Sequence, residues 1–338
     1  VKEDDLEVCL LDSRGSTLLL YKPAEHHPPS YEKPEPLKPL AAPEEMKSVE
    51  ELYLAGLRLN QFYNASVDPM SYYREALKRD PGDYRVNTQL GILCIKDYNW
   101  KEAEKYLQTA VDRITSNYTR PKDGEGLYYL GIAKRALGKT DEAYDYFYQS
   151  IWTSAWHSAG YYQLAEIDCQ KGEFDKALDH LNRSILTNGD NYKAYNLKTI
   201  VLRKLNDLKA ARELAETTLK TYKINHQALN EMYLLESLMG NSDQATKNLK
   251  ELTVIMRDHV QSYLELATDY SNCGFYGEAA DLLSRLETKG ENFPMMYYYQ
   301  GFYMKNGRYH QSTFILSKSL KNARHLLFPF QGRRNRHT

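Results

Sequence analysis

The sequence predicts an all-α solenoid of antiparallel helix pairs, and three observations support this fold class. Small residues recur every 34 residues along most of the chain. Helical periodicity begins at Ser48 and continues to about Leu327, in runs separated by short turns. No strand-like alternation interrupts these runs. Since 34 residues is the length of one helix–turn–helix unit, the pattern indicates a repeat array.

The 34-residue spacing defines two series of small residues, one on each helix of a pair. Stepping from Ala143 gives Ala177, Ala211, Ala245 and Ala279, each early in a second helix. Stepping from Gly131 on the first helices gives Ala165, Thr199, Tyr233, Ala267 and Gly301, with Tyr233 as the exception. Upstream, Gly91 and Ala103 form the same pair. We predict that these residues let the two helices of a unit approach closely, and that the Tyr, Leu and Phe around them are mainly core.

Two further segments precede the helices, and a third follows them. Residues 1–22 predict a β-hairpin, because "LEVCLL" and "STLLLY" flank the turn-forming "DSRG". Because two strands alone are marginal in water, we expect the hairpin to pack on the rest of the chain or to be the end of a β-domain whose beginning is missing, and we favour the second. Residues 23–47 hold seven of the twelve prolines and predict an extended linker. Residues 48–327 are the array, and the basic residues 328–338 are expected to form a disordered tail.

Composition and motifs limit the partners and the reactions that we expect for this chain. The chain has 338 residues, 26% of them charged, and a formal net charge of −1, so we expect neither nucleic acid nor membrane as a partner. The four cysteines lie far apart, and we interpret them as reduced thiols, which favours a cytoplasmic location. No HExxH, GxSxG, P-loop or GxGxxG motif occurs. We expect no metal, cofactor or catalytic residue, and we interpret His157 and His226 as caps or surface groups.

The units resemble tetratricopeptide repeats. "GLYYLGIAKRALGKTDEAYDYFYQSI" carries the family's pattern of Leu–Gly in the first helix, Gly at the turn, then Ala and Phe in the second helix. "YREALKRDPGD" matches the typical end of a unit. The resemblance implies a right-handed α-α superhelix whose concave face is lined by first helices. It places eight units at 49–83, 84–123, 124–157, 158–191, 192–225, 226–259, 260–293 and 294–327.

A narrower resemblance concerns whole-protein architecture. "SVEELYLAGLRLNQF", "EALKRDPGDYRVNTQLG" and "DEAYDYFYQSIW" are similar to segments of large bacterial proteins of unknown function. Those proteins join an N-terminal β-rich domain, related to sugar-processing β-sandwiches, to repeats of this kind. The resemblance implies that a catalytic or sugar-binding domain lies outside this chain.

The family resemblance also suggests where a ligand would bind. The best-known mode of the family clamps a C-terminal carboxylate with Lys, Asn and Arg from successive first helices. The corresponding places here include Arg85, Gln89 and Glu125, so that clamp is absent. The predicted groove residues are instead Tyr128, Tyr129, Ile132, Tyr162, Gln163, Glu166, Lys193, Asn196 and Arg203. The alternative that the tyrosines among them pack on the next unit stays open.

Two functions remain open from the sequence. The first is a non-enzymatic scaffold that binds a protein or peptide through the concave surface. The second is an accessory or oligomerisation module of a carbohydrate-active protein whose catalytic β-domain is missing from this chain, so that carbohydrate would be bound through that domain. A homo-oligomer stays open in both.

Overall fold

The computed structural model describes residues 6–22, 40–62, 66–117, 120–121, 123–287 and 293–307. The chain divides into two compact units, Val1–Met46 and Lys47–Thr338. Most of the predicted linker, the predicted second helix of the eighth repeat and the predicted tail lie outside the described residues. Over the described ranges, no helix combines the length and the apolar character that a bilayer span requires.

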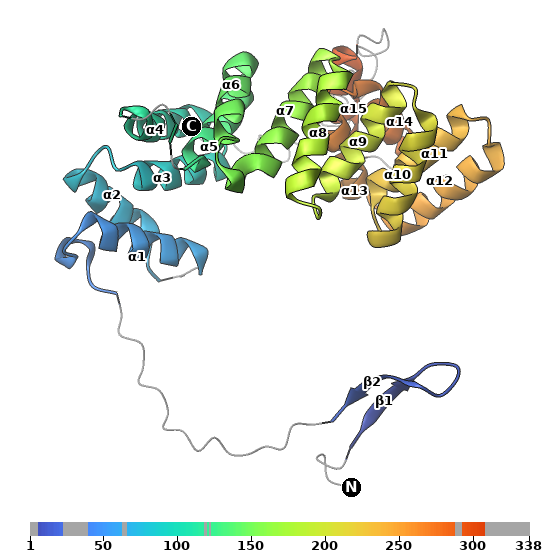
Figure 1. Cartoon of the computed structure of the whole chain (residues 1–338), viewed down its shortest axis with the longest axis horizontal. Coiled ribbons are helices and arrows are strands. Elements are labelled where there is room, and N and C mark those ends of the chain that lie inside the picture. The colour runs from blue at the N-terminus through green and yellow to red at the C-terminus, as the bar shows by residue number, and fades with distance from the viewer. Residues whose placement is uncertain are drawn as a thin grey trace, which may run out of the picture. The chain divides into compact units, whose positions relative to one another are not determined.

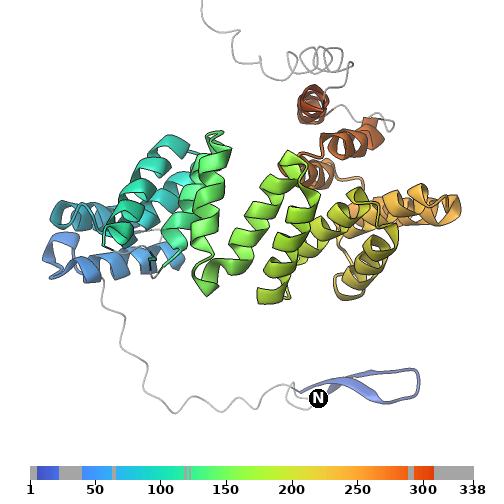
Figure 2. The ribbon, with the colours of Figure 1, turned by 45° about the horizontal axis from the view of Figure 1, so that its top comes forward.

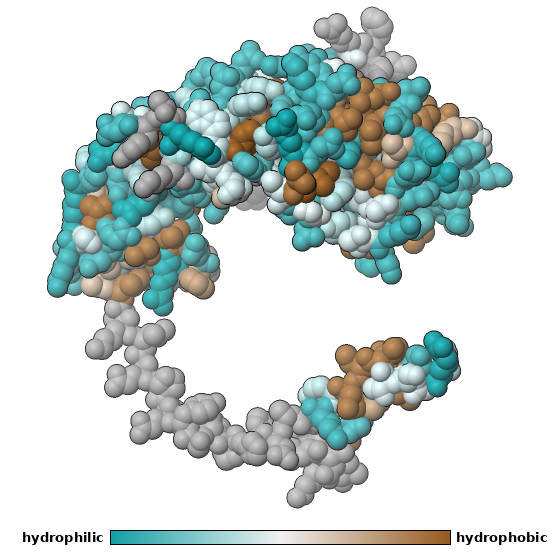
Figure 3. All heavy atoms as spheres, in the orientation of Figure 1, coloured by the Kyte–Doolittle hydropathy of each residue, from teal (hydrophilic) through white to brown (hydrophobic). Residues whose placement is uncertain are grey.

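The first unit contains the predicted hairpin. Strands β1 (Val8–Leu11) and β2 (Thr17–Tyr21) pair antiparallel, and a 3₁₀ turn, η2 (Pro43–Glu45), follows them. The Asp12 carboxylate accepts hydrogen bonds from the backbone N–H groups of Arg14 and Ser16, both at 2.8 Å, which closes the turn. Every strand residue is exposed, and Figure 3 shows apolar side chains at the surface of the hairpin. The hairpin therefore buries no core within the described residues.

The second unit is a run of antiparallel helix pairs, in agreement with the predicted all-α superhelix (Figure 1). The first helices are α1 (Val49–Gln61), α3 (Tyr84–Lys96), α5 (Glu125–Ala136), α7 (His157–Lys171), α9 (Tyr192–Lys204), α11 (His226–Leu238), α13 (Val260–Asn272) and α15 (Pro294–Asn306). The second helices are α2 (Pro69–Arg79), α4 (Trp100–Thr115), α6 (Thr140–Ser150), α8 (Phe174–Thr187), α10 (Leu208–Thr221), α12 (Ser242–Met256) and α14 (Tyr276–Glu287). A 3₁₀ turn, η3 (Ser154–Trp156), separates α6 from α7.

An N-cap begins the array, and a residue with positive φ forms the turn within most of the repeats. Ser48 caps α1 by accepting a hydrogen bond from the Glu51 N–H at 3.1 Å. The Glu51 carboxylate in turn accepts from the Lys47 N–H at 2.8 Å, one residue before the place that a standard capping box uses. The turns between paired helices hold a residue with positive φ: Tyr98 first, and then, at steps of 34 residues, Gly138, Gly172, Asn206, Gly240 and Gly274. Glycine takes this left-handed conformation at the lowest steric cost, which explains its recurrence there.

The helices of a pair meet where a glycine faces a large side chain. A Cβ atom built on Gly56 would lie 2.5 Å from the Tyr73 ring, and one on Gly131 would lie 2.7 Å from the Phe147 ring. Neither distance leaves room for a methyl group. The small residues predicted from the spacing are all buried: Gly91, Ala103, Gly131, Ala143, Ala165, Ala177, Ala211, Ala245, Ala267, Ala279 and Gly301. The two helices of a pair therefore approach closely because Gly or Ala, with little or no side chain, lies at the contact.

The regular packing of each helix on the preceding one is interrupted after α12. Every consecutive pair of helices from α1 to α12 is in contact, whereas α12 and α13 barely touch. Arg257 and Asp258 lie between them and both adopt positive φ, of 53° and 52°, which is costly for residues with side chains. Helices α13 and α14 then lie beside earlier helices, as Figures 1 and 2 show, and α15 packs on α13 and α14. The rings of Phe174 at the start of α8 and Phe275 before α14 stack at 6.3 Å.

We predict that Gly131→Ala destabilises the protein by about 2 kcal/mol, because the added methyl group must displace the buried Phe147 ring. Urea denaturation measures this change. Gly189→Ala is the control, since Gly189 is exposed with no atom near its Cβ position, and it should change stability by less than about 0.5 kcal/mol. Adding Phe147→Leu should relieve part of the cost. A stabilised Gly131→Ala variant would show that helix propensity outweighs the contact.

We also predict that removing residues 1–46 leaves the helical array folded, with its melting temperature unchanged. The two units are separately compact, and the strands contribute no buried side chain. Circular dichroism of the truncated chain tests this expectation. Loss of helical signal or aggregation on truncation would mean that the first unit supports the array.

Candidate protein-binding surface

The groove residues predicted on α5 pack against the turn before α7. The Tyr128 ring stacks on the Trp156 ring with centroids 4.8 Å apart, and the Tyr129 ring meets it edge-on at 5.7 Å. Ile132 packs beside Phe147 and Leu164 in the core between these units. Tyr128 and Tyr129 are both half-buried, so each combines packing with a partly accessible surface.

The predicted residues on α7 face the end of α13. Arg135 of α5 donates hydrogen bonds to Gln163 at 2.6 Å and to the backbone carbonyl of Asn272 at 2.8 Å, and it forms an ion pair with Glu166. Burial, followed by the nearby Glu166 carboxylate, raises the pKa of the Tyr162 hydroxyl well above its usual value. The chain's own C-terminal helices therefore occupy this part of the first-helix surface.

A buried ionic network fastens α13 and α14 to α9 and α11. Arg203 pairs with Glu231 at 2.7 Å, and the two side chains are 8% and 0% exposed. Glu231 also accepts a hydrogen bond from the Tyr270 hydroxyl at 2.6 Å. Arg203 reaches Glu278 of α14 at 3.2 Å, and Asn230 donates to the Tyr270 hydroxyl at 2.8 Å. Burial lowers the pKa of Arg203, but attraction to Glu231 outweighs it, so the guanidinium stays charged.

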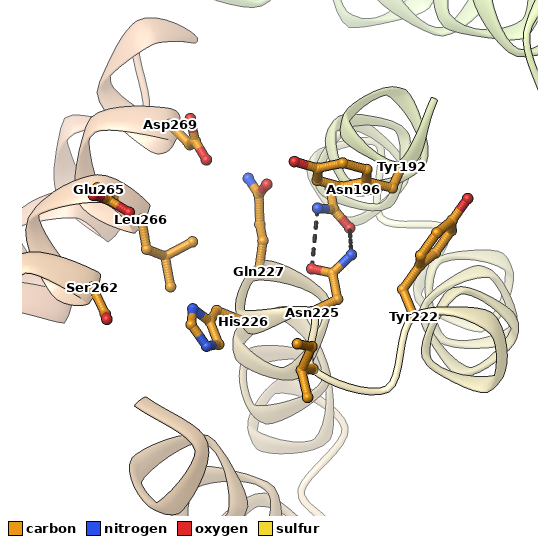
Figure 4. A pocket seen from close by; sticks show the side chains of 11 residues that line it. Tyr192, Asn196, Tyr222, Asn225, His226, Gln227, Ser262, Glu265, Leu266 and Asp269 are labelled. Atoms are coloured by element: carbon orange, nitrogen blue, oxygen red, sulfur yellow. Dashed lines mark hydrogen bonds between the residues drawn. The ribbon is translucent and has the colours of Figure 1, made fainter. Parts of the chain in front are cut away.

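A pocket of about 390 Å³ remains between α9, the start of α11 and α13 (Figure 4). It is lined by Tyr192, Asn196, Tyr222, Ile224, Asn225, His226, Gln227, Ser262, Glu265, Leu266 and Asp269. The Asn196 and Asn225 side-chain amides exchange two hydrogen bonds, at 3.1 and 2.9 Å, and form a fixed wall. Of the predicted groove residues, Asn196 lines this pocket, and Lys193 lies exposed one turn earlier on the same helix.

The sequence pattern does not predict most of the pocket residues as binding residues. Glu265 and Asp269 lie on α13, and they reach the pocket only because that helix folds back. His226, which the sequence suggested as a cap or surface group, lines the pocket as the first residue of α11, while Asn225 is the N-cap. Burial lowers the pKa of His226, against the opposing effect of Glu265, so the imidazole is neutral near pH 7.

Towards the N-terminus, the first helices carry a second group of aromatic and charged side chains. The Arg85 guanidinium lies 4.9 Å from the centre of the Tyr53 ring, and it pairs with Asp83 at 3.0 Å and with Glu50. Burial raises the pKa of the nearby Glu125 carboxyl, with a further contribution from Asp123. Arg85 is thus already paired, and these residues do not form a carboxylate clamp.

Comparison with solved structures shows which class of protein has this fold. The pilF protein of Pseudomonas aeruginosa superposes with a TM-score of 0.53 and 16% identity, over 63% of this chain and 93% of that one. A tetratricopeptide repeat protein from Parabacteroides merdae gives a TM-score of 0.50 and 18% identity, over 71% of this chain and 93% of that one. The fold is therefore that of the tetratricopeptide-repeat proteins, as the sequence predicted.

Sequence comparison adds a distant relative. The human cell division cycle protein 16 homolog is 27% identical over 117 residues, which make up 34% of this chain and 19% of that protein. The match thus spans about a fifth of the relative's length. No family model matches the chain. The predicted similarity to large bacterial proteins with a β-rich domain stays a prediction.

We predict that Glu231→Gln destabilises the protein by about 3 kcal/mol, because it leaves the buried Arg203 charge without its nearest partner. Thermal or urea unfolding measures the effect. The matched control is Asp179→Asn, which breaks an exposed pair with Arg183 and should cost less than about 1 kcal/mol. Equal stability of the two variants would mean that the buried pair adds nothing to folding beyond its cost of desolvation.

Proposed function

We propose that this chain is a non-enzymatic protein-interaction scaffold that binds a protein or peptide through the surface of its first helices. The observation that carries the proposal is that several first helices carry a tyrosine with accessible surface. Tyr53 of α1, Tyr84 of α3, Tyr129 of α5 and Tyr192 of α9 are each at least partly exposed, whereas Tyr162 of α7 packs against the C-terminal helices. Tyrosine offers a large apolar face and a polar tip, which suits contact with a partner protein.

The charges on this surface support a largely neutral or mixed ligand. Arg85, Arg135 and Arg203 are each paired with carboxylates of the chain itself. Cations that are already paired offer little attraction to nucleic acid, whose phosphates are bound by free Lys and Arg side chains. A polypeptide with both apolar and polar side chains matches the surface better.

Peptide selection with the whole chain tests the proposal. A displayed library of random 12-residue peptides should yield binders, and the double variant Tyr53→Ala/Tyr129→Ala should weaken the selected peptides about tenfold. Tyr148→Ala is the matched control, because Tyr148 is 49% exposed on the second helix α6. Binding that Tyr148→Ala reduces as much as the double variant would place the ligand elsewhere. Failure to select any peptide would contradict the proposal.

One observation favours the alternative of an accessory module in a carbohydrate-active protein. The apolar residues of the hairpin are more than half exposed on both faces: Val8, Leu10, Leu11, Leu18, Leu19, Leu20 and Tyr21. Such a surface favours a further β-rich partner over free exposure to water. The coding sequence upstream of residue 1 tests this alternative, which requires a β-domain with paired carboxylates.

A further inference from the structure

The pocket between α9, α11 and α13 is lined by a mostly buried glutamine whose amide has no partner in the described chain. Gln227, in the first turn of α11, is 8% exposed, and its side chain points into the pocket (Figure 4). Within the described residues, no group hydrogen-bonds to its amide. The amide opens into the pocket, so a ligand that enters can hydrogen-bond to it without first displacing a protein group. The neighbouring Asn196 and Asn225 amides satisfy each other and do not compete for it.

A carboxylate faces the same space from the opposite wall. Asp269 of α13 is half-buried and, within the described residues, forms no ion pair or hydrogen bond. Figure 4 shows its side chain directed toward Gln227 and Tyr192. Burial raises its pKa, Lys193 of α9 opposes this rise, and the Glu166 and Glu265 carboxylates add to it. The acidic groups around Asp269 thus outnumber the one lysine that acts on it, and the pocket favours a cation.

Aromatic rings complete the pocket. Tyr192 and Tyr222 line it from the side of α9 and α10, with ring centroids 5.8 Å apart. A planar cation gains contact energy on such faces. A guanidinium can also donate several hydrogen bonds from one fixed plane, so it can reach a carboxylate and an amide oxygen together, which an ammonium does less well. The volume of about 390 Å³ suits a single side chain rather than a folded motif.

We propose that this pocket binds the guanidinium group of an arginine side chain on a partner protein, with Asp269 and Gln227 as its hydrogen-bond acceptors and Tyr192 as a stacking face. This inference rests on the proposed scaffold function and names one chemical feature of the partner. Neither Asp269 nor Gln227 has a partner in the described chain. The guanidinium therefore displaces only water when it binds to them.

The test uses the full chain and two small probes, N-acetyl-arginine amide and N-acetyl-citrulline amide. Citrulline has the shape of arginine without its charge. Side-chain amide signals of Gln227, assigned by their loss in Gln227→Leu, are followed by NMR during titration. We expect saturable shifts with the arginine probe and at least about tenfold weaker binding of the citrulline probe, since only the former forms a charge-assisted hydrogen bond. Higher salt should weaken the arginine probe alone.

Matched variants then separate the pocket from general charge effects. Asp269→Asn should weaken the arginine probe by about tenfold. It should melt no lower than the parent, since it removes a half-buried, unpaired carboxylate. Glu213→Gln removes one exposed carboxylate on α10, outside the pocket, and should leave binding unchanged.

Three results would overturn the assignment: equal binding of the two probes, arginine binding that Asp269→Asn does not affect, or no shift of Gln227 with either probe. Selected peptides that still depend on Tyr53 and Tyr129 would leave the scaffold proposal standing in each case. Conversely, arginine binding without any selectable peptide would uphold the pocket and contradict the scaffold. The two failures are therefore distinguishable.

Discussion

The close approach of two helices within each repeat is the constraint on which the rest of the structure depends. Gly91 leaves a space that the Leu107 side chain fills, and Gly131 does the same for the Phe147 ring. Because these contacts leave no room for a methyl group, they fix the distance and orientation of each pair. A helix pair buries its remaining apolar side chains by stacking on the next pair. Pairs of uniform geometry therefore build one continuous core.

The reversal after α12 changes how the first-helix surface is used. In a simple array, the first helices of successive units would line an open groove. Here α13 and α14 cover part of that groove and are held by the buried network around Glu231 and Tyr270. Burying charges is costly unless they are paired, and this network satisfies most of its polar atoms internally. The network therefore ties α13 and α14 to α9 and α11 through directional contacts.

The same reversal creates the pocket. Its two walls come from α9 and α13, which are more than 50 residues apart in sequence, and its floor comes from the start of α11. Arg203 is paired with Glu231 and Glu278, whereas Gln227 and Asp269 are left with unused hydrogen-bonding capacity in the described chain. We therefore interpret Arg203 as a structural residue, because its polar atoms bond within the chain. Gln227 and Asp269 are candidate binding residues, because theirs do not.

The sequence by itself determined the repeat: its period, its start near Ser48 and the small residues at Gly131 and Ala143. These features depend on neighbours within one unit, so local patterns encode them. Only the tertiary structure decided that Tyr162 and Arg203 face the chain's own helices and that Asp269 reaches the pocket. These contacts join units far apart in sequence, and they depend on a reversal at Arg257 and Asp258 that no periodic pattern signals, because glycine is absent where the backbone takes positive φ.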